Sequence, residues 1–514
     1  MIKYTSNNQI SLEDFIQPFG GTLSQENRWV KMAQFLPWDE MVSVYVKSMS
    51  QKMGRKAVDP RVAVGTLIIK HILRATDEDT IDFIKENPYL QYFLGYREYR
   101  YEQPFAASLF VSIRRRLGEQ AFEELTKHLM TRVQKIEQKI AASDDDSAPP
   151  KSGARDNRDK TQAVDTKPEN KGHLIVDASV APADIKYPTD LDLLNEAREK
   201  SEQLIDLLYV SEKGKIKPRT YRQTARKDYL SVTKQRKKRK KIIRKAIRSQ
   251  LNYLGRNLRT LKKLLDEKGS HTFPLAHKHQ KKYWVIQELY RQQKQMYDEK
   301  MHKITDRIVS ISQPHIRPIV RGKSGKEVEF GAKISVSVVE GYSYLDKLSW
   351  DAYNESKDLI VQINTFKDRF GHYPEWVSAD KIYGSRENRA FMNQHGIKYT
   401  GVALGRRPKE ITTERRELEA ERKQKGKQRS QVEGSFGVGK RKYDLDLVKA
   451  KTQVTSESWI GMVYLVMNIA RFLRVIFYPF LKNGYRMFKK LKTVLRNWFA
   501  VPNYGMVKYR LLTF

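Results

Sequence analysis

The sequence predicts an α/β domain that is interrupted by a long helical insertion and preceded by an all-helical region. Three observations support this fold class. Apolar residues recur at helical spacing through most of residues 1–140, a short apolar run begins at Leu174, and apolar and polar residues alternate between Ile334 and Val338. The order of these patterns along the chain gives the order of its domains.

The N-terminal region, residues 1–140, is predicted to be a compact helical module. Asp59 is a suitable N-cap for a helix over Pro60–Leu73, and a short helix follows over Asp77–Glu86. Successive short helices with a basic end are typical of helix-turn-helix DNA-binding domains, but a helical bundle with a solvated basic edge fits the pattern equally well. The last short helix ends in three candidate DNA-binding residues: Arg114, Arg115 and Arg116.

Residues 141–172 are predicted to be a flexible linker, because they are polar and nearly free of large apolar side chains. The apolar run from Leu174 to Val176 then starts the first strand segment, residues 173–190, and ends at Asp177. A carboxylate at the end of a buried strand costs free energy unless it is paired. Asp177 is therefore either the start of a turn, the simpler interpretation of this stretch alone, or a metal ligand with partners elsewhere.

A basic helical insertion is predicted over residues 191–325. Nine of the twelve residues from Lys234 to Lys245 are basic. So many like charges in about three helical turns repel one another unless an anion covers them, which favours phosphate contact over a bare solvated face. The candidate DNA contacts in this run are Lys234, Arg236, Lys237, Lys238, Arg239, Lys240 and Lys241.

The rest of the α/β domain is predicted over residues 326–481. A second strand covers Ile334–Val338 and a third covers Tyr342–Leu348, followed by an amphipathic helix. A short apolar strand then ends near Asp380, as the first strand ends at Asp177. The domain thus carries two carboxylates at strand ends.

The net charge indicates the partner of the chain. The 97 Lys and Arg against 60 Asp and Glu leave a formal charge of +37. Such an excess, spread along most of the chain, indicates an acidic polymer, and nucleic acid is the usual one. There is no cysteine, which excludes disulfides and zinc–thiolate sites. With no secretory signal pattern at its N-terminus, the protein is expected to be cytoplasmic and associated with the nucleoid.

One apolar stretch, Trp459–Leu481, is nearly long enough to cross a bilayer. It contains Arg471 and Arg474, and each central Arg would cost roughly 2.5 to 3.5 kcal/mol in a membrane. We therefore predict a packed amphipathic helix, followed by a basic C-terminal tail over residues 482–514.

Two aspartates at the ends of neighbouring strands can face one another at the edge of an α/β sheet. They repel unless cations lie between them, and a pair of Mg²⁺ ions about 3.5 to 4 Å apart is the usual solution. Glu433 is the candidate third carboxylate, because on a helix Arg429 and Lys440 fall within about 40° of it. That face offers one metal ligand and two phosphate-binding cations, although an ordinary exposed Arg–Glu pair is the simpler alternative. Close approach of a backbone or a nucleic acid strand would explain three nearby glycines: Gly434, Gly437 and Gly439.

The segments that carry these carboxylates are HLIVDAS, WVSADKIYGSREN and RSQVEGSFGVGKRKYDLDLVKAKT. In order and spacing they resemble the catalytic segments of bacterial insertion-sequence transposases with a ribonuclease-H-like DDE domain, and the resemblance extends over about residues 40 to 475. It implies a ribonuclease-H-like mixed sheet. It also implies that Asp177, Asp380 and Glu433 are the catalytic, metal-binding triad, and that Arg429 and Lys440 belong to a Tyr, Arg, Glu, Lys signature.

One position departs from that signature. Gly426 stands where the family has a tyrosine, three residues before Arg429. In relatives this aromatic residue is associated with stacking near a flipped base at the transposon end. Tyr383, three residues after Asp380, is a candidate substitute for that stacking role.

The resemblance implies a transposase that cuts transposon-end DNA and joins it to target DNA by Mg²⁺-dependent phosphoryl transfer. It implies two Mg²⁺ ions, for which Mn²⁺ can substitute, terminal inverted repeats and target DNA as partners, and a homodimer on DNA. The alternatives are a non-catalytic basic nucleic-acid-binding protein and a hydrolytic nuclease of the same fold. Three intact carboxylates argue against the first, since at a DNA-facing site they would only weaken binding. The second uses the same ligands and stays open.

Overall fold

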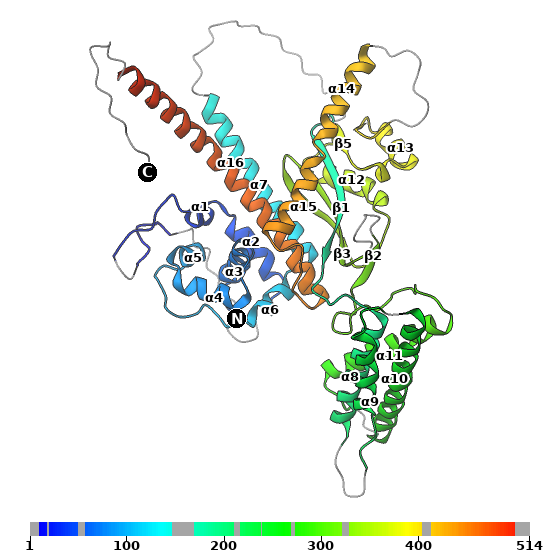
Figure 1. Cartoon of the computed structure of the whole chain (residues 1–514). Helices are drawn as coiled ribbons and strands as arrows, with labels where there is room; N and C mark the ends of the chain where they lie inside the picture. Colours follow the sequence, from blue (N-terminus) through cyan, green and yellow to red (C-terminus); the bar gives the residue numbers. More distant parts are fainter. Residues whose placement is uncertain are drawn as a thin grey trace, which may run out of the picture.

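The computed structural model describes residues 10–17, 20–49, 57–145, 169–209, 216–237, 239–268, 273–320, 328–402 and 413–498. Figure 1 shows three parts: a helical module at the N-terminus, a mixed sheet with its helices, and a separate helical bundle inserted into the sheet domain. The long helices α7 and α16 cross between the module and the sheet.

The regular elements that the structure describes in the N-terminal module are helices. Their bounds are α1 Arg28–Phe35, α2 Trp38–Val46, α3 Pro60–Leu73, α4 Asp77–Glu86, α5 Pro88–Phe93, α6 Leu109–Arg116 and α7 Glu119–Asp145. The predicted start of α3 is confirmed, because the Asp59 carboxylate accepts from the amides of Arg61 and Val62. Helix α7 extends past residue 140 to Asp145, and residues 146–168 of the predicted linker lie outside the described residues.

Helix α16, Gln453–Trp498, joins the module to the sheet. Its segment Gln453–Val475 is long and apolar enough to cross a membrane, but 72% of the apolar window is buried inside the protein. It packs on α7, α6 and α3 on one side and on β4 on the other. The part of this stretch whose side chains are described, up to Val475, is therefore a packed helix, as the sequence predicted. One apolar core runs through the module, this helix and the sheet.

The sheet is mixed. Its strands are β1 His173–Pro182, β2 Arg317–Val320, β3 Val328–Val339, β4 Tyr342–Ser349, β5 Trp376–Ser378 and β6 Lys398–Tyr399. The order is β2-β3-β1-β5-β6, with β4 also paired to β3. Strand β1 is antiparallel to β3 and parallel to β5, so it is the central strand where the two kinds of pairing meet. Between and after the last strands lie α12 Leu359–Phe370, α13 Arg386–Gln394, α14 Thr413–Lys427 and α15 Ser430–Lys442.

Strand β1 does not end at Asp177, as the sequence suggested. It continues to Pro182 and stays paired with β3 along its whole second half, from Asp177 opposite Val336 to Pro182 opposite Gly331. A Cβ at position 331 would overlap the carbonyl oxygen of Ala181, so the glycine allows the two strands to approach. The turn interpretation of Asp177 is wrong, and its carboxylate lies in mid-strand.

The insertion folds as its own bundle after β1. Its helices are α8 Asp190–Leu208, α9 Arg222–Thr233, α10 Lys240–Lys268 and α11 His277–Asp298. Helices α8, α10 and α11 share a separate apolar core that includes Leu194, Leu254 and Ile286, and α9 packs on α8 and α10 through Val232. The two ends of the insertion meet at the sheet, where the Gln313 side chain donates a hydrogen bond of 3.1 Å to the carbonyl oxygen of Asp184.

The basic run Lys234–Lys245 is not one continuous helix. Helix α9 ends at Thr233 and α10 begins at Lys240, so the first part of the run is the loop between them. Like charges at helical spacing disfavour a helix through such a run, which accounts for the break. Lys238 lies outside the described residues.

Candidate active site

Asp177 occupies the middle of β1, half-buried, and its carboxylate accepts a hydrogen bond of 2.8 Å from the amide of Ala178. Burial is the main cause that raises the pKa of Asp177, and the negative charges of Glu355 and Asp380 raise it further. The positive charge of Arg429 opposes this rise. Asp177 therefore lies within electrostatic reach of two other carboxylates and one guanidinium.

Asp380 is exposed and follows β5 by two residues, so the predicted strand end at this position is confirmed. Its carboxylate accepts from the amide of Lys381 at 2.7 Å and caps a short 3₁₀ turn over Lys381–Tyr383. Tyr399 on β6 donates its hydroxyl to the Asp380 carbonyl oxygen at 3.2 Å. These two contacts fix the backbone that presents the Asp380 carboxylate.

Glu433 lies in the first turn of α15, with 56% of its side chain exposed. Its carboxylate forms an ion pair of 2.8 Å with Arg429, one turn earlier, so the simpler Arg–Glu interpretation describes this contact. The positive charge of Arg429 also opposes the rise in the pKa of Asp177, so it acts electrostatically on both carboxylates. Lys440 is partly buried in the last turn of the same helix.

The three glycines of α15 have different surroundings. A Cβ at Gly439 would lie 3.0 Å from Leu445 and 3.3 Å from Met467, so the protein itself approaches there. A Cβ at Gly437 would meet only the guanidinium of Arg441. Around Gly434 there is no atom within 4 Å of that position among the described residues. The helix surface next to Glu433 is therefore open.

His173 links the segments that carry the three carboxylates. Its Nδ1 lies 2.8 Å from the side-chain oxygen of Gln428, and its Nε2 lies 2.7 Å from the hydroxyl of Ser378. An amide oxygen only accepts, so Nδ1 donates and the serine hydroxyl donates to Nε2. Burial lowers the pKa of His173, which favours this neutral form. One imidazole thus joins β1, β5 and the segment that leads into α15.

The sequence interpretation missed His173. The available signal was its position four residues before Asp177 on a strand, since residues at even spacing point to the same face.

Two family models and one relative match parts of this chain. Residues 377–470, which include Asp380 and Glu433, match the family model of the transposase DDE domain, and residues 18–116 match a second family model described as a transposase domain. The uncharacterized protein ORF8 in the nfe locus of Rhizobium meliloti is 30% identical over 168 residues, which are 33% of this chain and 68% of that protein. This chain belongs to the DDE transposases. No solved structure matches it.

Transposases of this family generally use divalent metal ions, and the donors of this transposase suit such ions chemically. Asp177, Asp380 and Glu433 offer carboxylate oxygens, the ligands that Mg²⁺ prefers. The negative charge of Asp380 raises the pKa of Asp177, and a cation between them would relieve that repulsion. Within the described part of the chain, no three acidic or histidine side chains are grouped closely enough to hold a metal ion. Glu433 is instead turned to Arg429.

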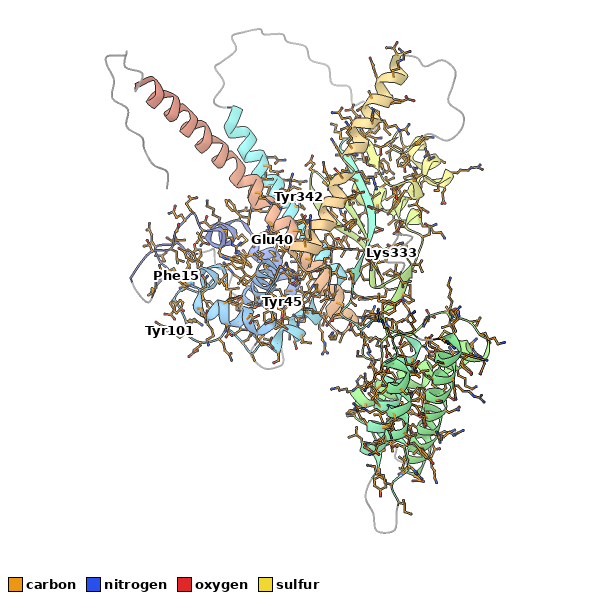
Figure 2. All side chains as sticks on the ribbon, viewed as in Figure 1. Phe15, Glu40, Tyr45, Tyr101, Lys333 and Tyr342 are labelled. Atoms are coloured by element: carbon orange, nitrogen blue, oxygen red, sulfur yellow. The ribbon has the colours of Figure 1, made fainter. Side chains whose placement is uncertain are left out.

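A further carboxylate of the transposase, Glu355, was not predicted. It begins a short 3₁₀ helix over Glu355–Asp358 and forms an ion pair of 2.6 Å with Lys333, which Figure 2 labels on the sheet. Glu355 is neutralised by Lys333 and lies in the loop before α12. No local sequence pattern therefore indicated that its charge acts on Asp177.

The predicted stacking role of Tyr383 is wrong. This side chain is fully buried, at 0% exposure, and burial strongly raises its pKa. Its hydroxyl has no hydrogen-bond partner among the described residues. A ring enclosed in the core cannot stack on a DNA base. Tyr399, which contacts the Asp380 backbone and is only partly buried, is an aromatic residue at this site that the sequence interpretation did not identify.

The predicted DNA contacts of the transposase have unequal surroundings. Arg114 is 7% exposed and donates to both carboxylate oxygens of Asp77, at 2.9 and 2.7 Å, which contradicts a role in DNA contact. Arg116 is partly buried and donates to the hydroxyl of Tyr45 at 2.8 Å. Arg115 is exposed. In the insertion, the described predicted cations are all exposed: Lys234, Arg236, Lys237, Arg239, Lys240 and Lys241.

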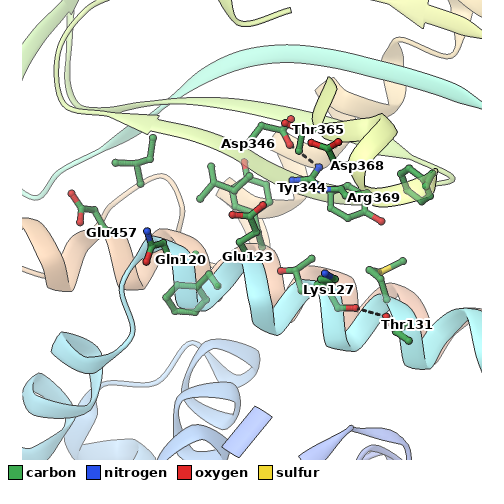
Figure 3. Close-up of a pocket in the computed structure, with 18 of the residues that line it drawn as sticks. Gln120, Glu123, Lys127, Thr131, Tyr344, Asp346, Thr365, Asp368, Arg369 and Glu457 are labelled. Carbon is green, nitrogen blue, oxygen red and sulfur yellow. Dashed lines mark hydrogen bonds and ion pairs between the residues drawn. The ribbon is translucent and has the colours of Figure 1, made fainter. Parts of the chain in front are cut away.

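A cavity of about 480 Å³ lies away from these carboxylates, between α7, β4, α12 and α16 (Figure 3). Its lining includes Glu123, Lys127, Asp346 and Arg369, and none of the three predicted catalytic residues. The three predicted catalytic carboxylates therefore lie outside this cavity.

Proposed function

We propose that this transposase cuts DNA at transposon ends and joins it to target DNA, with Asp177, Asp380 and Glu433 as its catalytic carboxylates. The observation that carries the proposal is the His173 bridge. It ties the strand of Asp177, the strand that precedes Asp380 and the segment that precedes Glu433 into one unit. A structural histidine alone would not need to connect the three segments that carry the acids.

The same three carboxylates are the proposed ligands of two Mg²⁺ ions, for which Mn²⁺ can substitute. When bound, these ions supply Lewis-acid activation of the attacking oxygen and stabilisation of the leaving 3′-oxygen. Phosphoryl transfer of this kind needs no covalent bond between protein and DNA.

Arg429 has a second part in the proposal. Its guanidinium neutralises Glu433 and lies within electrostatic reach of Asp177 in the DNA-free chain. A phosphodiester at the site is a competing, bidentate acceptor for the same guanidinium. When Arg429 turns to the phosphate, Glu433 is released to act as a ligand, and the open surface at Gly434 leaves room for the DNA strand.

The other predicted features remain parts of this proposal. The mixed sheet, with its helical insertion after the first strand, supports a ribonuclease-H-like catalytic domain. The exposed cations of the insertion are proposed to contact DNA, together with Lys440 and Arg115. The N-terminal helical module is proposed to take part in binding the terminal inverted repeats. A homodimer on DNA is proposed because two transposon ends must be brought together, in the cytoplasm and at the nucleoid.

The test is cleavage of DNA that carries the terminal repeats, with Mg²⁺ present. We expect Asp177→Asn, Asp380→Asn and Glu433→Gln each to lower cleavage and strand transfer by at least about 1,000-fold, because charge stabilisation at the reacting phosphate is lost. DNA binding should stay within about twofold of the unaltered protein, since phosphate contacts by cations dominate affinity. Glu419→Gln, at an exposed carboxylate of α14, is the matched control and should cut normally.

Cleavage that persists in any of the three variants would exclude that residue from the site. Loss of cleavage in the Glu419 control as well would show that charge change, and not the triad, is responsible. Cut ends that are never joined to target DNA would identify a hydrolytic nuclease, and binding of the repeats without any cleavage a non-catalytic DNA-binding protein.

A further inference from the structure

Helix α10 of the insertion carries a stripe of positive charge along one side. Its sequence has ten basic and two acidic residues, a net charge of +8. Six exposed cations lie within an arc of about 80° on one side of the helix, at successive spacings of three, four or eight residues. We name them the α10 stripe: Lys241, Lys245, Arg248, Arg256, Arg259 and Lys263. Four of the six lie outside the basic run Lys234–Lys245 that the sequence singled out.

The α10 stripe differs from neighbouring surfaces in that its charges are not neutralised. On α11, Arg291 pairs with Glu288 at 2.6 Å and Lys294 pairs with Asp298 at 2.7 Å. Within the described residues, the stripe has one ion pair, between Lys263 and Glu267 at 3.9 Å. No described carboxylate pairs with the other five stripe cations.

This arrangement has a cost to the free protein. Like charges three or four residues apart on a helix destabilise it by about 0.2 to 0.5 kcal/mol per pair. The stripe contains such pairs at Lys241–Lys245, Lys245–Arg248, Arg256–Arg259 and Arg259–Lys263. Burial of leucines on the opposite side of α10, including Leu254 and Leu261, offsets this cost. An anion along the stripe would remove the repulsion.

The dimensions of the stripe fit duplex DNA. Lys241 and Lys263 are 22 residues apart, which corresponds to about 33 Å along a helix and is close to one turn of B-DNA at about 34 Å. Arg256 is also held in place, because its guanidinium lies 4.7 Å from the ring centre of Tyr221 and 4.9 Å from that of Tyr253. A cation that is already ordered loses less entropy on binding a phosphate.

The composition of α10 favours DNA over an anionic membrane. A helix that binds at a membrane surface needs an exposed apolar face beside its cations. Among the described side chains of α10, no large apolar residue is exposed, because the leucines face the bundle core.

We propose that the α10 stripe binds the phosphate backbone of duplex DNA, without reading its sequence, at a distance from the catalytic carboxylates. The insertion bundle lies apart from the sheet domain, as Figures 1 and 2 show. This inference rests on the proposed function in taking DNA as the substrate. Its role is to hold the flanking or target duplex while the carboxylates act on the transposon end.

The experiment measures binding of a random-sequence duplex of about 30 base pairs, without terminal repeats and with EDTA present, over a series of salt concentrations. The triple variant Lys245→Gln, Arg248→Gln, Arg259→Gln should have a shallower dependence of log K on log[salt]. We expect the magnitude of the negative slope to fall by about 2.7, or 0.9 for each lost phosphate contact. At about 0.1 M salt its affinity should fall by roughly 100-fold or more.

The matched control is Lys217→Gln, Arg291→Gln, Lys294→Gln, which removes the same charge from the same bundle. These cations are similarly exposed but are paired with Asp206, Glu288 and Asp298. The slope of this variant should stay within about 0.5 of the unaltered protein. Equal losses of slope in the two triple variants would mean that only net charge matters, and an unchanged slope in the stripe variant would mean that the stripe does not contact DNA. Either result would overturn the proposal.

Two further measurements separate this inference from the proposed function. Asp380→Asn should retain the full salt slope, because it removes no cation, whatever it does to cleavage. Binding to vesicles with anionic lipid should not distinguish the two triple variants, and a loss confined to the stripe variant, with DNA binding intact, would assign the stripe to membranes.

Discussion

Two basic regions of this transposase, one at the end of α6 and one along α10, have opposite surroundings in the structure. In the N-terminal module, Arg114 is buried and forms a bidentate pair with Asp77. In the insertion, the α10 stripe is exposed and almost free of ion pairs among the described residues. The difference is a single carboxylate that the fold brings from 37 residues away. A run of cations indicates a binding surface only where no acid folds against it.

The largest expected effect that tests this comparison is on stability. Arg114→Ala should lower the free energy of unfolding by about 3 kcal/mol, because it removes a buried guanidinium and leaves the partly buried Asp77 with Lys70 alone. Arg248→Ala on α10 should change it by less than about 0.5 kcal/mol, since that side chain is exposed and forms no ion pair with a described residue. Urea unfolding followed by circular dichroism measures both, and equal values would show that the two runs are not structurally different.

The next effect is the pH dependence of the module. Burial of His71 lowers its pKa to about 3, and the neighbouring charges of Lys70 and Arg114 add to this shift. In the unfolded chain His71 binds a proton below a pH of about 6.5, whereas in the folded chain it does so only near a pH of about 3. The free energy of unfolding therefore falls as pH decreases from about 6.5 toward 3. Between about pH 6.5 and 5 the loss should be about 2 kcal/mol. His71→Leu should flatten this part of the stability curve, and an unchanged curve in that variant would assign the pH dependence to another group.

The smallest effect separates the members of the N-terminal run. Arg115 is exposed, whereas Arg116 is partly buried and donates to Tyr45. We expect Arg115→Gln to lower the slope of log K against log[salt] by about 0.9, as for one phosphate contact, and Arg116→Gln to leave it unchanged. Each should alter stability by about 1 kcal/mol or less. The same slope in both variants would mean that exposure does not decide which arginines bind DNA.

Local patterns in the sequence predicted much of the fold. The cap at Asp59, the short helix over Asp77–Glu86 and the strand that ends before Asp380 follow from residues close together in the chain. The end of β1 could not be predicted in this way. Its continuation beyond Asp177 depends on pairing with β3, which lies more than 150 residues later.

The candidate site shows the same limit. The carboxylates and their order were visible in three short segments, and the transposase family was visible with them. The contacts of His173, Glu355 and Tyr383 were not, because each depends on packing between segments far apart in sequence. Strand spacing places His173 on the same face as Asp177, but no local pattern shows that it bridges to Gln428 and Ser378 or that Tyr383 is buried.

The hydrogen bond between Gln313 and Asp184 affects how the helical insertion can be changed in length or composition. It holds the entrance and the exit of the insertion side by side, while the bundle between them keeps a separate core. A segment whose two ends coincide can be gained, lost or exchanged without changing the register of the strands that flank it. The helical bundle can therefore be shortened or replaced while the central strand with Asp177 keeps its pairing with β3.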